Sequence, residues 1–194
     1  MKRKKKKLAT TIVLLAILAV VMIIFFFGIG YQEKIKHPEK PSAVTTSAGP
    51  TGEIKMKKVT LFFLSEADNL LHPEEREIPV STPGEEARAL VEELIRGSKT
   101  GFLSVLPETT RVRQVFITDD GTAYVDLSRQ VLQASYYGSS GEMAAVYSIV
   151  NSLAYNFKNI KRVSLLVEGN ERETLGGHVD LSRPFNPDYS LVTR

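Results

Sequence analysis

The chain has 194 residues, of which 43% are hydrophobic and none is cysteine, and its formal net charge is +3. The lack of cysteine excludes disulfides, thiolate catalysis, cysteine-ligated metals and attachment of a lipid to a cysteine. Residues 1–57 carry +8 (11 Lys/Arg, 3 Asp/Glu), whereas residues 58–194 carry −5 (14 Lys/Arg, 19 Asp/Glu). The larger, acidic part therefore lacks the basic surface typical of nucleic-acid binding.

The N-terminal segment predicts a membrane anchor. Six Lys/Arg residues within the basic segment 1–7 precede an uncharged apolar run from Leu8 to about Ile29. A run of roughly 22 residues measures about 33 Å as a helix, enough to cross a hydrocarbon core of about 30 Å. The positive flank predicts that the N-terminus is cytoplasmic. We therefore expect one transmembrane helix over residues 8–30 in the bacterial cytoplasmic membrane, with the rest of the chain extracytoplasmic or periplasmic.

A cleaved signal peptide is the alternative interpretation of this segment. Gly28 and Gly30 are spaced like a cleavage site, but signal-peptide cores are usually about 7–15 residues long, which favours an uncleaved signal anchor. Residues 31–57 are rich in Pro, Ser, Thr and Gly and carry too little apolar surface to offset the entropy of ordering. We expect a flexible linker there, followed by a single domain over residues 58–194.

The first half of this domain predicts two strands and a helix. Residues 59–64 (VTLFFL) form a short apolar run typical of a buried strand, and residues 76–80 predict a second extended segment. Thr82 and Glu85 have the spacing of a capping box around Pro83, and Gly97 is placed to end the helix. The apolar face of this helix has the 3.6-residue period and consists of Ala87, Leu90, Val91, Leu94 and Ile95.

The second half predicts a hairpin, a helix and a last strand. Residues 112–118 and 122–127 are joined through the turn Asp119-Asp120-Gly121, and a short helical turn is expected over residues 128–132. An apolar stripe predicts a helix from about Glu142 to Phe157, and residues 163–167 predict a strand. The predicted fold class is α+β, with two helices packed on one face of a small mixed sheet.

Few residues suggest chemistry. His178 and Asp180, in the segment LGGHVD, form the one candidate metal or catalytic pair, although a loop histidine beside an aspartate is more often a structural contact. The serine cluster at 138–141 (GSSG) lacks the nucleophile-elbow pattern and is interpreted as a flexible loop that caps the second helix.

Paired glutamates and a short repeat also have ordinary structural explanations. The pairs Glu85-Glu86 and Glu92-Glu93 lie off the apolar stripe of the first predicted helix, where we expect a solvated face; Glu74-Glu75 is a third pair. The sequence VDLS occurs at residues 125–128 and again at 179–182, and its Asp and Ser side chains are suited to closing turns.

Seven stretches, taken in order, resemble the GerMN domain of sporulation and spore germination across residues 58–190. These are VTLFFLSEADNLLHPEEREIP, EEARALVEELIRG, LPETTRV, GTAYVDLS, EMAAVYSIVNSL, IKRVSLLVEG and TLGGHVDLSRPF. The resemblance implies a fold similar to ring-building motifs and a non-enzymatic extracytoplasmic module of envelope assemblies, without cofactor or metal. It also implies structural roles for the family-motif positions Gly97, Gly121, Asp126, Gly176, Gly177, His178 and Asp180.

We therefore predict a membrane-anchored scaffold that binds an envelope protein or a second copy of itself, in a setting that includes sporulation or germination assemblies. Two alternatives stay open. A peptidoglycan-binding module would stack sugar rings on Tyr136 and Tyr137, beside the Gly/Ser segment. A cell-wall-active enzyme would use the region of His178 and Asp180, and it is the least favoured reading.

Overall fold

The structure, a computed structural model, describes residues 55–193, apart from the side chains of residues 134–137. The predicted basic segment 1–7, the transmembrane helix 8–30 and nearly all of the linker 31–57 lie outside the described residues, as do the Tyr136 and Tyr137 side chains. Within residues 55–193, no helix is long and apolar enough to cross a membrane.

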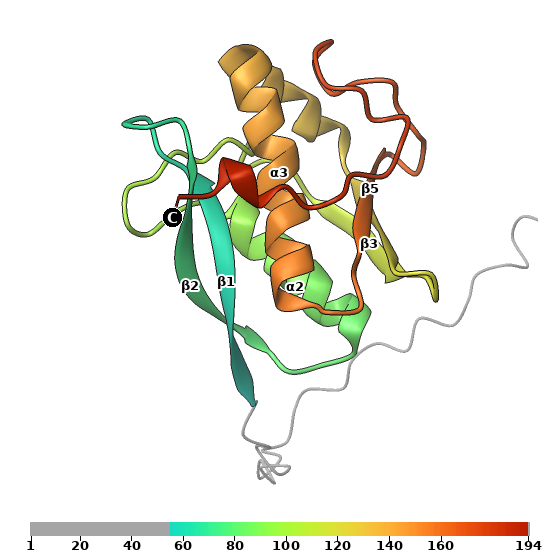
Figure 1. The fold of residues 1–194 in the computed structure, drawn as a ribbon. Coiled ribbons are helices and arrows are strands. Elements are labelled where there is room, and N and C mark those ends of the chain that lie inside the picture. The colour runs from blue at the N-terminus through green and yellow to red at the C-terminus, as the bar shows by residue number, and fades with distance from the viewer. Residues whose placement is uncertain (1–54, 194) are drawn as a thin grey trace, which may run out of the picture. The chain divides into compact units, whose positions relative to one another are not determined.

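The described chain is an α+β domain (Figure 1). Its helices and strands follow the predicted order, with a 3₁₀ helix, η1, before the second α-helix and a short one, η2, near the C-terminus. The elements are β1 (Met56–Leu64), β2 (Leu71–Pro79), α2 (Pro83–Ile95), β3 (Val112–Ile117), β4 (Thr122–Leu127), η1 (Arg129–Tyr137), α3 (Gly138–Asn156), β5 (Arg162–Val167) and η2 (Tyr189–Leu191).

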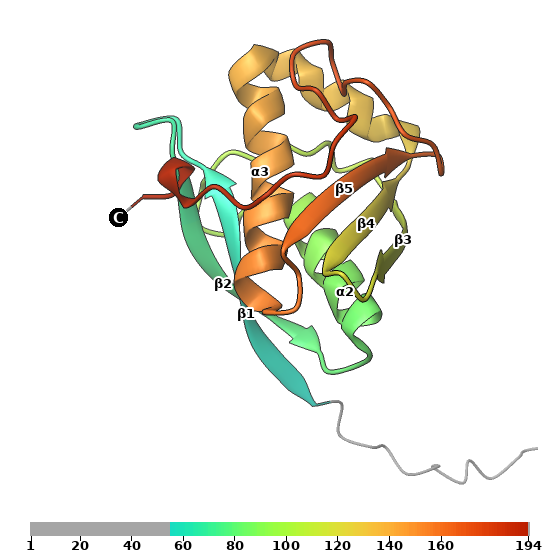
Figure 2. The same cartoon turned by 45° about the vertical axis from the view of Figure 1, so that its right-hand side comes forward.

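The strands form two sheets, whereas the sequence analysis predicted one. β1 and β2 pair as an antiparallel hairpin, while β4 pairs antiparallel with β3 and parallel with β5. A parallel pair needs a crossover connection, and α3 supplies it between β4 and β5. Both α-helices pack on one face of the three-stranded sheet, as predicted for the sheet as a whole (Figure 2).

Side chains of α3 explain why β1 joins no strand beyond β2. The Thr60 N–H donates to Asn156 Oδ1 at 2.9 Å, and Asn156 Nδ2 donates to the Thr60 carbonyl at 2.7 Å. The Phe62 N–H donates to Ser152 Oγ at 3.0 Å. These bonds replace those of a neighbouring strand, so the edge of β1 is satisfied by a helix.

The helices differ from prediction mainly at their ends. α2 buries the five predicted apolar residues and starts at Pro83, but the Thr82 hydroxyl bonds the Glu85 carboxylate instead of a backbone N–H. Glu86 instead accepts the Ser81 N–H at 3.0 Å, so the capping box has shifted by one residue. The predicted loop at 138–141 is in fact the first turn of α3, which begins four residues earlier than expected.

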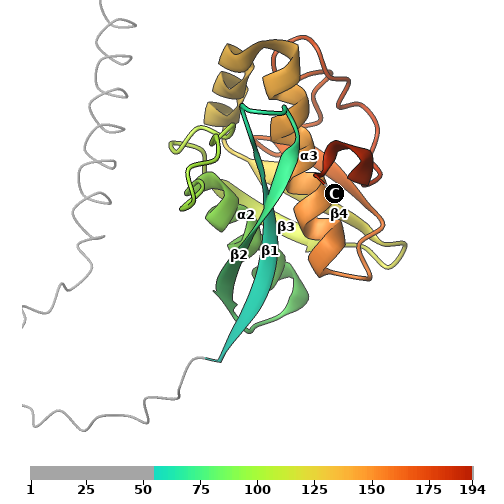
Figure 3. The ribbon, with the colours of Figure 1, turned by 60° about the vertical axis from the view of Figure 1, so that its left-hand side comes forward.

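The C-terminal segment connects the two sheets. Phe185 forms an antiparallel bridge with Val163 on β5, and Val192 a parallel bridge with Leu71 on β2. Between them, Asn151 of α3 exchanges two hydrogen bonds with the backbone of Asp188, at 2.8 and 2.9 Å. The short helix η2 therefore lies beside α3 (Figure 3).

Candidate functional site

The structure does not bring His178 and Asp180 together as a catalytic or metal site. Both side chains are exposed, and among residues 55–193 no hydrogen bond or ion pair joins them. Asp180 Oδ1 accepts the Ser182 N–H at 2.9 Å, and hydrogen bonding to Ser182 lowers the pKa of Asp180. The described part of the chain also holds no cluster of three or more His, Cys, Asp or Glu residues able to bind a metal.

The loop that carries these residues closes instead around Glu142, a buried carboxylate of α3. Glu142 is 0% exposed, and its Oε1 accepts the N–H groups of Leu175 (3.1 Å), Gly176 (3.0 Å) and Val179 (3.2 Å). Its Oε2 accepts the His178 N–H at 3.1 Å. Burial alone would raise the pKa of Glu142, but these four backbone hydrogen bonds outweigh it and the pKa is lowered.

Glu142 is a centre that the sequence analysis missed. It was expected only as the first residue of a helix, whereas the family-motif positions Gly176 and His178 were singled out. The available signal was an acidic residue in register with the apolar stripe of that helix, since Val146, Ile149 and Leu153 follow at helical spacing and are also buried. The loop and the helix meet through this carboxylate.

Two of the motif glycines occupy positions that other residues would strain. Gly97 follows the last turn of α2 with φ of +85°, and a Cβ there would lie 2.3 Å from Ser104 Oγ. Gly121 has φ of +85° in the predicted hairpin turn, and a Cβ there would lie 2.7 Å from the Asn159 carbonyl oxygen. Gly177 also has a positive φ, of +101°, but open space around it. Backbone geometry thus favours glycine at these positions.

Asp126 joins β4 to the turn after β5. Its side chain is buried, and its Oδ1 accepts the Gly169 N–H at 2.7 Å while Oδ2 lies 3.1 Å from Arg113 Nε. Asp180, its counterpart in the VDLS repeat, is exposed and bonds only within its own turn. The two copies of the repeat therefore form different contacts.

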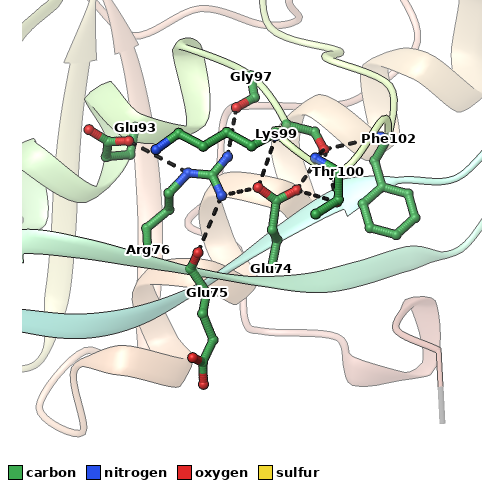
Figure 4. Close-up of polar contacts among 9 residues, drawn as sticks. Glu74, Glu75, Arg76, Glu93, Gly97, Lys99, Thr100 and Phe102 are labelled. Atoms are coloured by element: carbon green, nitrogen blue, oxygen red, sulfur yellow. Dashed lines mark hydrogen bonds and ion pairs between the residues drawn. The ribbon is translucent and has the colours of Figure 1, made fainter.

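A buried ionic cluster lies between β2 and the C-terminal end of α2 (Figure 4). The Arg76 side chain is 4% exposed; its Nη1 pairs with Glu74, and its Nε lies 3.7 Å from the Glu93 carboxylate. Arg76 Nη2 donates to the Gly97 carbonyl at 3.1 Å, which ties the cluster to the end of the helix. Three charged side chains on two elements are thus held together away from water.

Glu74 has further partners in the loop that follows α2. Its Oε2 accepts the hydroxyls of Ser98 and Thr100, each at 2.6 Å, and its Oε1 accepts the Lys99 N–H at 3.0 Å (Figure 4). Catalysis by a carboxylate requires access to a substrate atom. Because all these donors and Arg76 surround Glu74, its contacts are those of a link between strand, helix and loop.

The expected solvated glutamate face of α2 is wrong at two of its four positions. Glu86 is buried and pairs with Lys57 of β1, and Glu93 lies against Arg76 with its side chain 13% exposed. Glu85 and Glu92 bond neighbours on the surface of the helix. The hairpin covers the face of α2 that the period of apolar residues left as polar.

The outer face of the three-stranded sheet carries an apolar patch. Phe116 of β3 is 41% exposed and stacks on Tyr124 of β4, with ring centroids 4.8 Å apart and planes at 7°. Leu166 of β5 lies half-buried in the next cross-strand row. We call Phe116, Tyr124 and Leu166 the sheet patch. The helices pack on the opposite face, so the patch is available to a partner.

Comparison with known sequences identifies a family. A model of the Germane family, described as sporulation and spore germination, matches residues 60–173, more than half of the chain. No protein of curated function matches the sequence.

Solved structures give the same result. The tandem GerMN domains of the sporulation protein GerM from Bacillus subtilis are 25% identical with a TM-score of 0.56, covering 68% of this chain and 46% of theirs. The first GerMN domain of that protein is 28% identical with a TM-score of 0.50, covering 66% and 98%. A candidate lipoprotein from Clostridium perfringens, solved at 2.5 Å, is 26% identical with a TM-score of 0.50, covering 68% and 87%. These findings confirm the resemblance to GerMN domains.

Proposed function

The chain belongs to the Germane family of sporulation and spore germination, and from this we propose that it is a non-enzymatic binding module of the bacterial envelope. The helix expected over residues 8–30 would hold the domain at the outer face of the cytoplasmic membrane. The sheet patch would then bind an envelope protein. The description of the Clostridium perfringens neighbour as a candidate lipoprotein supports an envelope location.

The observation that carries this proposal is the sheet patch. The solvated face of a sheet normally carries polar side chains, and a contiguous apolar area on it is typical of an interaction site. Phe116 is exposed although it stacks on Tyr124, and aromatic side chains contribute strongly to interface energies. Arg113 and Arg162, which flank the patch on β3 and β5, provide a charged rim.

The polar clusters of the domain support a binding role over an enzymatic one. Glu74, Glu142 and Asp126 all lie inside the fold, with their oxygens occupied by protein donors. A catalytic group must instead reach a substrate atom. The buried carboxylates of the described chain therefore have structural contacts that account for them.

Site-specific photo-crosslinking tests the binding role. A photoreactive phenylalanine analogue placed at Phe116 of the full chain, in membranes of its own host, is expected to capture one protein partner. Tyr155 on α3 is the matched control, because it is an aromatic residue that is 57% exposed and lies outside the sheet patch. Equal capture at both positions would remove the patch as the binding surface. Retention of the chain by insoluble peptidoglycan, unchanged by Phe116→Glu, would instead support the wall-binding alternative.

The lack of cysteine makes the expected topology directly testable. Each single-cysteine variant has one thiol, so a membrane-impermeant maleimide labels it without background. We expect Thr45→Cys in the linker to react in intact cells after removal of any outer wall. Lys4→Cys should react only after the membrane is opened. Labelling of both variants, or of Lys4→Cys alone, in intact cells would contradict an extracytoplasmic domain.

A further inference from the structure

A cavity of about 530 Å³ opens between α2 and the segment that leads into β3. Arg88, Glu92, Ile95 and Arg96 contribute the α2 side, and these positions recur at helical spacing along one face. Residues 108 and 110–112 contribute the other side. The volume lies within the usual range of small-molecule sites. None of these residues belongs to the sheet patch, so this inference does not depend on the proposed function.

The cavity has an excess of cationic groups, because three arginines face two glutamates. Glu92 is occupied by Arg88, whose Nε lies 2.9 Å from its Oε1. Arg111 differs from the other two arginines, since it forms no ion pair within residues 55–193. Its Nη1 donates to the carbonyls of Glu108 and Thr110, each at 3.1 Å. A guanidinium has five N–H donors, so this anchoring leaves most of them for a ligand.

A buried hydroxyl supplies a second, independent indication of a ligand. Thr110 lines the cavity and is 1% exposed, and its Oγ1 has no hydrogen-bond partner in the described part of the chain. An unpaired buried hydroxyl destabilises a fold, and such groups in native proteins call for an explanation. The Thr110 N–H donates to the Pro107 carbonyl at 2.9 Å, so a turn fixes the position of this residue.

We propose that this cavity binds an organic carboxylate. Arg111 would engage the carboxylate through its free guanidinium donors, since a guanidinium fork matches the two oxygens of that group. The Thr110 hydroxyl would donate to the same group and gain the partner it lacks. The buried side chains of Ile95 and Val112 would contact an apolar body next to the carboxylate.

A pair of probes that differ only in charge tests the proposal. N-acetyl-leucine carries a carboxylate on an apolar body, and N-acetyl-leucinamide is its neutral counterpart. The full chain, labelled at isoleucine δ1 methyls, is titrated with each probe, and the Ile95 methyl reports on the cavity. We expect a saturable shift with the acid and none with the amide. Equal shifts would overturn the proposal, as would binding of inorganic phosphate as tight as that of the acid.

Variants then test the assigned residues. Arg111→Gln should weaken binding of N-acetyl-leucine about tenfold or more, and Thr110→Val about threefold. Arg172→Gln, an exposed residue outside the cavity that also loses one positive charge, should change the affinity less than about twofold. If Arg111→Gln does not fold, Arg111→Lys retains the charge without the fork and should still weaken binding. Unchanged affinity in the folded Arg111 variant would overturn the assignment.

Discussion

Two buried glutamates, Glu74 on β2 and Glu142 on α3, keep their charge by different means. Glu74 faces the guanidinium of Arg76 and accepts two hydroxyls and one backbone N–H. Glu142 has no cationic partner among the described residues and accepts four backbone N–H groups of one loop. The first arrangement depends on a single countercharge, whereas the second depends on the conformation of a loop. They should therefore fail in different ways.

Removal of the countercharge should have the largest effect. Arg76→Met keeps an apolar stem but leaves Glu74 buried without its cation, and we expect a loss of about 3–5 kcal/mol in the free energy of unfolding. Urea unfolding of the variant and the parent measures this loss as a fall in the midpoint at unchanged slope.

The matched control for Arg76 removes both charges of the pair. Because a buried ion pair can often be replaced by uncharged residues at little cost, Glu74→Gln/Arg76→Met should recover most of the lost stability. A loss below about 1 kcal/mol in Arg76→Met alone would mean that Glu74 does not need the guanidinium.

Substitution of the loop-binding carboxylate should have the next largest effect. Glu142→Gln keeps the shape but turns one acceptor into a donor that faces backbone N–H groups, so we expect a loss of about 2–3 kcal/mol. Glu171→Gln, an exposed glutamate in the same C-terminal segment, is the control and should be nearly neutral.

Hydrogen exchange distinguishes the two glutamates. In Glu142→Gln the N–H groups of Gly176 and His178 should exchange faster, because they lose their carboxylate acceptor. In Arg76→Met the same two amides should change only in proportion to global stability. Equal local acceleration in both variants would mean that the loop responds to the whole core and not to Glu142.

The pattern of apolar residues predicted the elements of this domain but not the partners of its buried charges. The stripe from Ala87 to Ile95 identified α2 because helical period and burial coincide there. Glu93 lies off that stripe, and only the hairpin packed on the helix explains its burial. The contacts of Glu142 come from residues 33–37 positions away, so local periodicity could not reveal them. The same holds for Asn156 and Ser152, which bond β1 from 90–96 positions away.

Acid titration should show the Glu142 interaction at a smaller scale. The folded-state pKa of Glu142 lies below the ordinary value of 4.5, so its contribution is fully present above pH 4.5 and is lost as the pH falls through the folded-state pKa. One such group changes stability by at most about 1.4 kcal/mol per pH unit. We expect the stability gap between the parent chain and Glu142→Gln to narrow below pH 4.5. A gap that is constant from pH 6 to pH 3 would show that the carboxylate charge does not matter.

The smallest expected effect has the opposite sign and concerns Thr110, whose buried hydroxyl lacks the partners that Glu74 and Glu142 have. Thr110→Val removes that hydroxyl at similar shape and should stabilise the ligand-free chain by about 1 kcal/mol in urea unfolding. Thr122→Val is the matched control, because the buried Thr122 hydroxyl bonds Asp120 at 3.1 Å and accepts from Arg162 Nε at 2.8 Å. The control should lose about 1 kcal/mol. If both variants are destabilised alike, the Thr110 hydroxyl already has a partner. If the signs differ, the fold retains an unpaired hydroxyl at a cost in stability, as is typical of residues kept for binding.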